Sequence, residues 1–447
     1  MKPKETEQSP QNDLFREELA NLLNLNHELC QLANIIDWDY LNNELGQFYT
    51  GESGQPPKSI RLMAGLHYLK HAFALSDEHV IERWVENPYW QYFCGMQHFQ
   101  HQPPIDPTSM TRFRQRIGET GCEKMLAVTI QAGIKTETVK EQSLNSVTVD
   151  TTVMENNITF PTDSALLNKA RNALVKLTRI HGIKLRQTYE RVSKKLEAQA
   201  SRYFHAKQFK RGQKAVKKIK CRLGRVIRDI ERQIEHCPSL TELFSTTLYR
   251  AKTLFNQKKN DKNKLYSLHE PATVCISKGK AHKRYEFGCK VSLAVTNRDN
   301  FVVCCQALEG NPYDGHTLAE TLETTKKLTG VTPERCFVDK GYKGHKIEES
   351  GHTTKVYISG QKRGMKSKAL KKALKRRSAI EPVISHIKSD GLLERSFLKG
   401  MDGNKYNAIL CGAGHNFRLI LKKLRLLFAW IFLVIIASKN QTGVRLA

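Results

Sequence analysis

The chain has 447 residues, of which 40% are hydrophobic, and 72 Lys and Arg against 44 Asp and Glu give it a formal net charge of +28. That length allows two or three domains, and the hydrophobic content excludes a wholly disordered basic chain. The eleven cysteines form no Cys-x-x-Cys pair, which argues for a reducing compartment and against a disulfide framework or a zinc module. The charge indicates a polyanionic partner, most simply nucleic acid.

The first part of the chain is expected to be helical, as a segment over residues 1–57 and a compact domain over residues 58–140. Ser76 can cap one helix, and Asp106 followed by Pro107 can start another. This latter helix carries Arg112, Arg114 and Arg116. Short helices that end in an arginine-rich one fit a helix-turn-helix-like DNA-binding domain. A helical packing domain with exposed arginines fits the pattern equally well.

The positive charge is concentrated in two blocks. Residues 169–232 hold 21 Lys and Arg against 4 acidic residues, and residues 361–377 hold 9 Lys and Arg and no acid. The rest of the chain is nearly neutral. Two basic blocks in a neutral chain predict two surfaces that contact nucleic acid, although a solvated helix face or a disordered basic linker is the alternative for each.

The first block lies in a predicted α-helical insertion over residues 163–270. Apolar residues recur there at spacings of three and four, as a buried helix seam requires: Val216, Ile219, Leu223, Val226 and Ile230. We expect two long helices joined near residues 207–213. The candidate DNA contacts on their basic faces are Lys217, Lys218 and Arg222.

The β elements lie on both sides of this insertion. Alternating Val and Thr over residues 146–153 predict a first strand, within a segment over residues 141–162. Residues 271–395 then predict a hairpin (285–296 and 301–308), a helix (316–328), two strands (335–339 and 355–359) and a helix (368–390). A helical tail over residues 396–447 follows. This order predicts a mixed α/β layer with a large helical insertion after its first strand.

The longest apolar run, residues 426–437, is shorter than the ~20 residues that span a bilayer. We expect it to be a terminal core helix. The first 26 residues contain no apolar stretch typical of a secretory signal. We therefore expect no membrane partner, and because the chain lacks a phosphate-binding loop motif, no nucleotide cofactor.

Three carboxylates are candidates for a metal site. Asp150 lies in the first strand and Asp339 closes a later one, where an unpaired buried charge is costly. Glu381 shares a helix face with Arg377 and Lys388, at spacings of four and seven. Taken alone, an aspartate can cap a turn and Glu381 can belong to a surface ion-pair ladder. Together, three carboxylates make an oxygen-ligand site suited to Mg²⁺ or Mn²⁺.

An ordered set of motifs resembles the DDE transposases of bacterial insertion sequences, of the insertion-sequence-five type with a ribonuclease-H-like core. The resemblance covers almost the whole chain. It is carried by ENPYWQYFCG (86–95), PIDPTSMTRFRQRIGE (104–119), VDTTV (149–153), KRYEFGCKVS (283–292), GNPYDGHTL (310–318), VDKGYKG (338–344) and RRSAIEPVISHIK (376–388).

The resemblance implies that Asp150, Asp339 and Glu381 are the catalytic carboxylates and hold two Mg²⁺ ions, with Mn²⁺ possible, and that Arg377 and Lys388 contact DNA. It implies cleavage at the terminal inverted repeats and strand transfer into target DNA, by a homodimer in the bacterial cytoplasm that associates with the nucleoid. A nuclease without strand transfer and an architectural DNA-binding protein are the alternatives.

Two positions in or near these motifs are Leu374 and Asp314. Leu374 stands where the wider family often has Tyr, so any aromatic stacking on an unpaired end base falls to another residue such as Tyr342. In the segment Asp314, Gly315 and His316, we expect Asp314 to cap the helix that follows.

Overall fold

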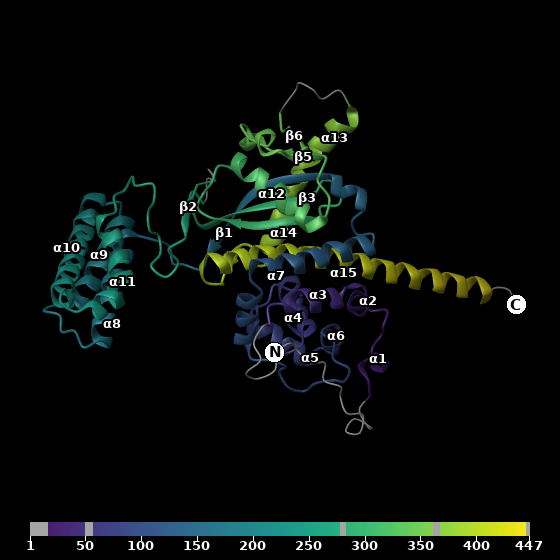
Figure 1. The fold of residues 1–447 in the computed structure, drawn as a ribbon, viewed down its shortest axis with the longest axis horizontal. Coiled ribbons are helices and arrows are strands. Elements are labelled where there is room, and N and C mark those ends of the chain that lie inside the picture. Colours follow the sequence, from purple (N-terminus) through teal and green to yellow (C-terminus); the bar gives the residue numbers. More distant parts are fainter. Residues whose placement is uncertain (1–16, 50–56, 278–282, 361–366, 444–447) are drawn as a thin grey trace. The chain divides into compact units, whose positions relative to one another are not determined.

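The computed structural model describes residues 17–49, 57–277, 283–360 and 367–443, with side chains in the last helix described to residue 428. The remaining parts of the predicted 1–57 segment, of the basic block 361–377 and of the tail lie outside the described residues. Two compact units are present. Unit 1 comprises Met1–Met154 and Lys290–Ala447, and unit 2 is the continuous segment Glu155–Cys289 (Figure 1).

Unit 1 begins with a set of helices, and each one after the first has its first turn fixed by a side-chain cap. The helices are α1 (Leu19–Leu22), α2 (Glu28–Ile35), α3 (Trp38–Gly46), α4 (Ile60–Ala72), α5 (Asp77–Glu86), α6 (Pro88–Phe93) and α7 (Pro107–Lys135). As expected, the Ser76 hydroxyl accepts the His79 amide at 3.1 Å and the Asp106 carboxylate accepts the Thr108 amide at 2.9 Å. Helix α7 is interrupted at Gly118, whose φ of 63° suits glycine.

The sheet of unit 1 has the strand order β3-β1-β5-β6, with β4 beside β3 and β7 beside β1. Its strands are β1 (Ser146–Asn156), β3 (Glu286–Thr296), β4 (Val302–Leu308), β5 (Arg335–Val338), β6 (Lys355–Ile358) and β7 (Arg395–Ser396). Strands β1, β5 and β6 are parallel, and β3 and β4 form an antiparallel hairpin. The Asn297 amide donates to the Ser146 carbonyl at 2.8 Å, so the end of β3 lies beside the start of β1 and the two strands are antiparallel.

Helices cover this sheet and connect its strands. The helices are α12 (Asp314–Thr329), α13 (Lys368–Arg376), α14 (Ile380–Ser389) and α15 (Gly400–Gly443). In Figure 1, α7 and α15 run side by side between the sheet and the N-terminal helices. A Cβ on Gly412 of α15 would lie 3.0 Å from Val302 and Cys305, so glycine allows α15 to pack closely on β4. The mixed α/β fold is ribonuclease-H-like, as predicted.

Unit 2 is a helical bundle with its own hydrophobic core, which involves α8, α10 and α11. Its helices are α8 (Asp163–Ile180), α9 (Glu190–His205), α10 (Phe209–Ile234) and α11 (Pro238–Asn256). Strand β2 (Val274–Ile276) pairs antiparallel with the first residues of β3. The predicted insertion, residues 163–270, lies within this unit.

The prediction of two long helices joined near residues 207–213 was wrong for the first helix, because residues 163–205 form two helices, α8 and α9. Helix α10 begins at Phe209, close to the predicted junction, and α11 follows it. Left-handed residues at Gly182, Tyr189 and Lys207 break the helical path, with φ of 70°, 53° and 56°. Helix α9 has a weak apolar seam, since its buried residues are the small Ser193 and Ala200. Hydrophobic periodicity alone therefore does not reveal it.

Two further expectations near the C-terminus need correction. The helix predicted over residues 368–390 is divided into α13, a 3₁₀ turn at Arg377–Ala379, and α14. Pro382 lies in the first turn of α14, where its missing N–H group leaves no hydrogen bond unmade, so it starts this helix without kinking it. The apolar run 426–437 begins with Leu426 and Leu427 exposed on α15, so these two are not core residues. Among the described helices, none has the length and apolar character needed to cross a membrane.

Candidate active site

Asp150 and Asp339 lie on neighbouring parallel strands. Strand β1 pairs with β5 so that Ser146 is opposite Arg335 and Thr148 is opposite Phe337. Continuing this register by two residues sets Asp150 opposite Asp339. Neighbouring strands lie ~4.8 Å apart, and residues that are opposite each other point to the same face of the sheet. The pairing of two strands far apart in the sequence therefore brings both predicted carboxylates to one position.

The backbone fixes one oxygen of each carboxylate. The Thr151 amide donates to Asp150 Oδ1 at 2.8 Å. Asp339 caps the 3₁₀ turn Lys340–Tyr342, where the Gly341 amide donates to Asp339 Oδ1 at 2.8 Å. These bonds orient the two carboxylates.

Asp314 joins this pair, against the expectation that it caps a helix. The cap position of α12 is Tyr313, which makes no side-chain cap bond, and Asp314 is the first helical residue. Its Oδ1 accepts hydrogen bonds from the Thr151 hydroxyl at 2.9 Å and from Lys290 Nζ at 3.0 Å. A Cβ on Gly341 would lie 3.0 Å from Asp339 Oδ1 and 3.4 Å from Asp314 Oδ2. The two carboxylates thus flank the same glycine.

Tyr342 lies among these acidic residues. Its side chain is fully buried, and its hydroxyl has no hydrogen-bond partner among the described residues. Burial and then the charges of Asp150 and Asp314 hold the pKa of this phenol well above 10, with a further contribution from Asp339. The three carboxylates therefore act on one side chain. Because its ring is buried, Tyr342 is not available in this structure to stack on a DNA base, and that alternative was wrong.

Glu381 is not among the carboxylates that these contacts bring together. It lies in the first turn of α14 with its side chain 65% exposed, and Arg377 Nη2 lies 3.7 Å from its Oε1. The preceding helix is fixed to the sheet: Arg376 Nε donates to the Asn297 carbonyl at 2.7 Å, and the Asn297 amide group donates to the Thr148 hydroxyl at 2.9 Å. The helix that precedes Glu381 is thus linked through Asn297 to Thr148, which lies two residues before Asp150 on β1.

The donor set suits a hard divalent cation, because every candidate ligand is a carboxylate. Asp150 and Asp339 each lie two residues beyond the paired residues Thr148 and Phe337, and the charges of both act on the buried Tyr342 hydroxyl. Within the described residues, however, no three His, Cys, Asp or Glu side chains stand close enough together to hold a metal ion. We therefore infer that Glu381 has to leave its pairing with Arg377 to complete a three-carboxylate site.

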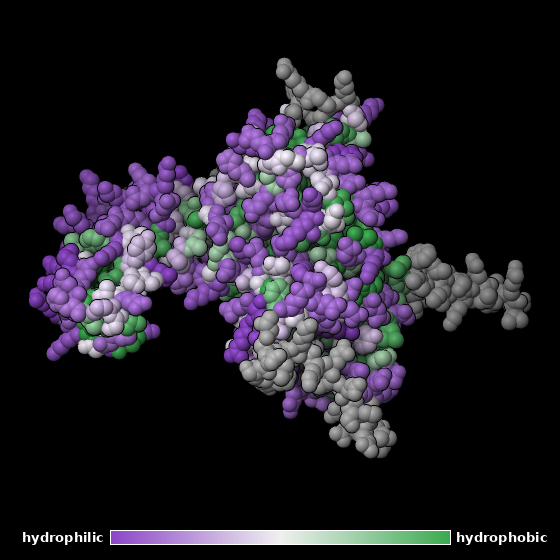
Figure 2. Space-filling view, viewed as in Figure 1, coloured by the Kyte–Doolittle hydropathy of each residue, from purple (hydrophilic) through white to green (hydrophobic). Residues whose placement is uncertain are grey.

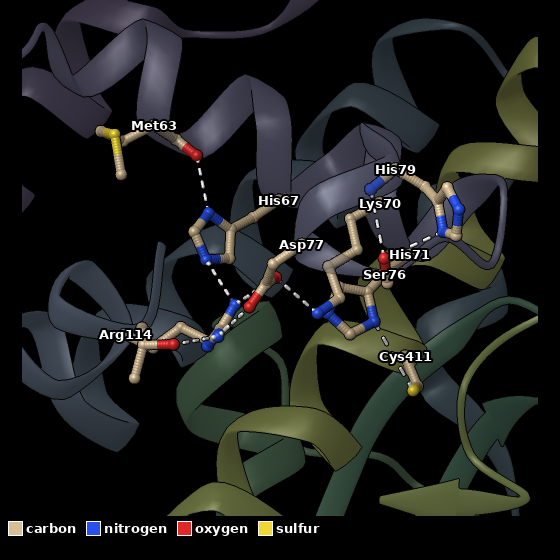
Figure 3. Close-up of polar contacts among 10 residues, drawn as sticks. Met63, His67, Lys70, His71, Ser76, Asp77, His79, Arg114 and Cys411 are labelled. Atoms are coloured by element: carbon tan, nitrogen blue, oxygen red, sulfur yellow. Dashed lines mark hydrogen bonds and ion pairs between the residues drawn. The ribbon is translucent and has the colours of Figure 1, made fainter. Parts of the chain in front are cut away.

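Arg114 does not belong to a DNA-contacting surface, so this expectation was wrong. Its side chain is 2% exposed and donates to both carboxylate oxygens of Asp77, at 2.9 and 2.6 Å (Figure 3). Lys70 Nζ donates to the same carboxylate at 2.6 Å. Burial raises the pKa of Asp77, but the Arg114 hydrogen bond and the Lys70 charge outweigh it and hold that pKa well below its usual value. The pattern of three arginines on α7 cannot distinguish this internal role from a surface role.

The other candidate DNA contacts have varied surroundings. Arg112 and Arg116 are exposed, and Arg116 lies over the Tyr49 ring at 4.6 Å. Lys217 and Lys218 on α10 are exposed, whereas Arg222 is half-buried over the Tyr189 ring at 5.0 Å. In unit 1, Lys388 is half-buried.

Unit 2 also has a cleft that sequence reasoning missed, here called the arginine cleft. It is lined by Arg186, Gln187, Tyr189, Arg225, Arg228, Asp229 and Arg232. Asp229 Oδ2 accepts the Arg186 amide at 2.9 Å, and Arg232 Nη2 lies 3.8 Å from its Oδ1. Four arginines thus line a cleft whose lining includes one carboxylate. The spacings of three and four between the last three arginines were the signal in the sequence, and Figure 2 shows a largely hydrophilic face on this unit.

A ribonuclease-H-like sheet with aspartates at neighbouring strand positions, followed by a helix that carries a glutamate, defines a class of enzymes that cleave or transfer nucleic acid strands. A family model described as a transposase domain matches residues 17–116, and one described as a transposase DDE domain matches residues 245–417. The chain belongs to the DDE transposases of bacterial insertion sequences.

One relative extends these comparisons. The protein named uncharacterized protein ORF8 in nfe locus, of Rhizobium meliloti, is 49% identical over 201 residues, which make up 45% of this chain and 97% of that protein. No solved structure matches the chain. Asp339 and Glu381 lie inside the match to the DDE domain, and Asp150 lies between the two matched segments. Members of this family act on DNA and normally use divalent metal ions.

Proposed function

We propose that this transposase, of the insertion-sequence-five type, binds the terminal inverted repeats of its element, cleaves strands there and transfers them to target DNA. The observation that supports the proposal is the β1–β5 register in a chain of the DDE family: Thr148 is opposite Phe337, and Asp150 and Asp339 each follow two residues later. The motif order of the sequence supports the subtype.

We propose that Asp150, Asp339 and Glu381 hold two Mg²⁺ ions, which Mn²⁺ can replace. When bound, such ions activate the attacking water or 3′-hydroxyl and stabilise the leaving oxygen. Release of Glu381 from Arg377 would leave that guanidinium group free to donate hydrogen bonds to a DNA phosphate. Lys388 would be the second cation at the phosphate. Arg377 is 15% exposed, so its position is well defined before DNA arrives.

Unit 2 is proposed to bind the DNA backbone. Lys217 and Lys218 are exposed on α10, and four arginines and one aspartate line the arginine cleft. Phosphate contacts of this kind give affinity without sequence specificity. In unit 1, α13 has no buried residue, so its lysines, which belong to the second basic block, are available for the same task. Arg112 and Arg116 remain candidates in the N-terminal domain.

We further propose that the enzyme acts as a homodimer in its synaptic complex, without a nucleotide cofactor or a membrane partner, in the cytoplasm at the nucleoid. The family's DNA substrate supports this assignment. A dimer brings two active sites to the two ends of one element.

The test compares binding and nicking of DNA that carries the inverted repeats. Asp150→Asn and Glu381→Gln should bind this DNA with wild-type affinity and produce no nicks in Mg²⁺. Glu349→Gln, which removes an exposed carboxylate paired with Lys346 at 3.2 Å, should nick normally. Wild-type nicking by both site variants would show that the carboxylates are misassigned. Nicking by the wild type without strand joining would favour a nuclease, and salt-sensitive binding without cleavage would favour an architectural protein.

A further inference from the structure

Asp314 is held between the elements that carry the two catalytic aspartates. Its Oδ1 accepts the hydroxyl of Thr151, the residue next to Asp150 on β1. Its Oδ2 faces Gly341, two residues after Asp339. We propose that Asp314 is a positioning residue, which fixes the spacing of Asp150 and Asp339 and so sets the affinity of their site for a divalent cation.

Lys290 makes this role possible by compensating the charge of Asp314. It lies on β3, and its side chain is 9% exposed. Its Nζ donates to Asp314 Oδ1 at 3.0 Å and to the Pro312 carbonyl at 2.6 Å, so the ammonium group is held at a fixed point. A buried ammonium beside a carboxylate offsets its charge. The charge of Asp314 is thus offset by Lys290, and a divalent cation would bind at Asp150 and Asp339.

The segment around Asp314 is fastened to the loop that follows Asp339. The Tyr313 hydroxyl donates to the Lys343 carbonyl at 2.7 Å. A Cβ on Gly315 would lie 3.4 Å from the His345 amide nitrogen, so the two loops pack closely at that glycine. Asp314 thus belongs to a rigid contact between the loops after β4 and β5.

The buried Tyr342 hydroxyl is an independent sign that a ligand belongs at this position. It has no hydrogen-bond partner among the described residues although it lies beside three carboxylates. A buried polar group without a partner costs free energy, and its usual explanation is a missing water or ion. A hydrated cation bound at Asp150 and Asp339 would give this hydroxyl a partner.

Positioning differs from two other roles that Asp314 could have. Oδ1 of Asp314 already accepts two hydrogen bonds, so a direct metal contact would fall to Oδ2, and loss of such a ligand should abolish binding as completely as loss of Asp150. A carboxylate in the first turn of a helix also stabilises that helix by ~0.3–1 kcal/mol. Loss of stability in an Asp314 variant is therefore not diagnostic, and cation affinity is the quantity to measure.

The proposal rests on the proposed metal site at Asp150 and Asp339. The experiment titrates the full-length protein with Mn²⁺ alone, without DNA, and follows the free ion by electron paramagnetic resonance. Asp314→Asn should weaken binding by ~10–100-fold, the usual effect of losing a group that orients metal ligands. Thr151→Val should weaken it as well, because the bond that orients Asp314 is lost. Thr151→Ser keeps the hydroxyl and should restore wild-type affinity.

The double variant Asp314→Asn with Thr151→Val should be no weaker than Asp314→Asn, because Thr151 acts through Asp314. Asp150→Asn is the reference: wild-type Mn²⁺ affinity in this variant would disprove the metal site of the proposed function. If Asp150→Asn loses binding and Asp314→Asn keeps it, the positioning role is wrong while the proposed function stands. If Asp314→Asn loses binding as completely as Asp150→Asn, Asp314 is a ligand and the positioning role is again wrong.

Discussion

At the scale of single residues, glycine at position 341 is required by the carboxylates around it. A Cβ there would lie 3.0 Å from Asp339 Oδ1, a distance that forces the carboxylate to move. Gly341→Ala should therefore fold normally but cleave DNA at least ~10-fold more slowly, since orienting contacts around metal ligands have effects of that size.

The matched control is Gly46→Ala in α3, where a Cβ would meet Ile60 Cδ1 at an ordinary 3.8 Å. Alanine favours the helix there, so this variant should retain activity and gain up to ~1 kcal/mol of stability. Cleavage at the wild-type rate by Gly341→Ala would show that the site tolerates displacement of Asp339.

Asp77 is the residue on which the buried ion network depends. Its carboxylate pairs with Arg114, which is 2% exposed, and with Lys70, which is 8% exposed. Asp77→Asn leaves both cations buried without their counterion and should lower the free energy of unfolding by ~3–5 kcal/mol. Denaturant unfolding can be followed by the fluorescence of the buried Trp84 and its neighbours in unit 1.

Glu78→Gln is the control for this prediction, because Glu78 lies in the same first turn of α5 but does not join the network. It should change stability by less than ~0.5 kcal/mol, as is usual for surface substitutions. An equal loss in the two variants would mean that charge at the helix N-terminus, and not the buried network, accounts for the effect.

At the scale of elements, the buried histidines of α4 and α15 make unit 1 sensitive to acid. Burial lowers the pKa of His67 to about 3 and that of His415 to about 4, from a usual value of 6.5. Below that value the unfolded chain takes up protons that the folded chain cannot, so stability falls as the pH drops from 6.5 towards 4. Urea unfolding at pH 7.5, 5.5 and 4.5 should show this decline, and constant stability across the range would contradict it.

The arginine cleft should act on binding and not on chemistry. Arg225→Gln with Arg228→Gln removes two positive charges from the lining of the cleft and should reduce the slope of log affinity against log salt by ~2. Strand cleavage at saturating DNA should be unchanged. Arg179→Gln is the control in the same unit, because Arg179 is already paired with Glu190 at 2.9 Å. An equal loss of affinity in the control would mean that the charge of unit 2 acts as a whole.

Elements with a strong local pattern of apolar residues could be predicted from the sequence, whereas features that depend on contacts in the folded chain could not. The strands carrying Asp150 and Asp339 could be predicted, because local alternation of Val and Thr or a short apolar run suffices. The separation of α9 from α8 could not, since the buried residues of α9 are the small Ser193 and Ala200. The roles of Arg114 and Asp314 depend on Asp77, Thr151 and Lys290, which meet them only in the folded chain.

At the scale of the whole molecule, the formal net charge of +28 is divided between the two units. Unit 2 carries the larger basic block on helices built around a core of their own, which suits a backbone-binding surface. Unit 1 carries the carboxylates together with the second basic block, of which residues 361–366 lie outside the described residues. Neutralising Arg377 and Lys388 should therefore impair cleavage more than affinity, in contrast to the arginine cleft.

The most direct test of the central claim is strand cleavage and joining of inverted-repeat DNA in Mg²⁺, by the wild type and by Asp339→Asn. The wild type should cut and join the ends, and should do neither when the metal is chelated. Asp339→Asn should bind the same DNA with unchanged affinity and yield no product. Product formation by Asp339→Asn at the wild-type rate, or by the wild type in the presence of a chelator, would contradict a metal site built on Asp150 and Asp339.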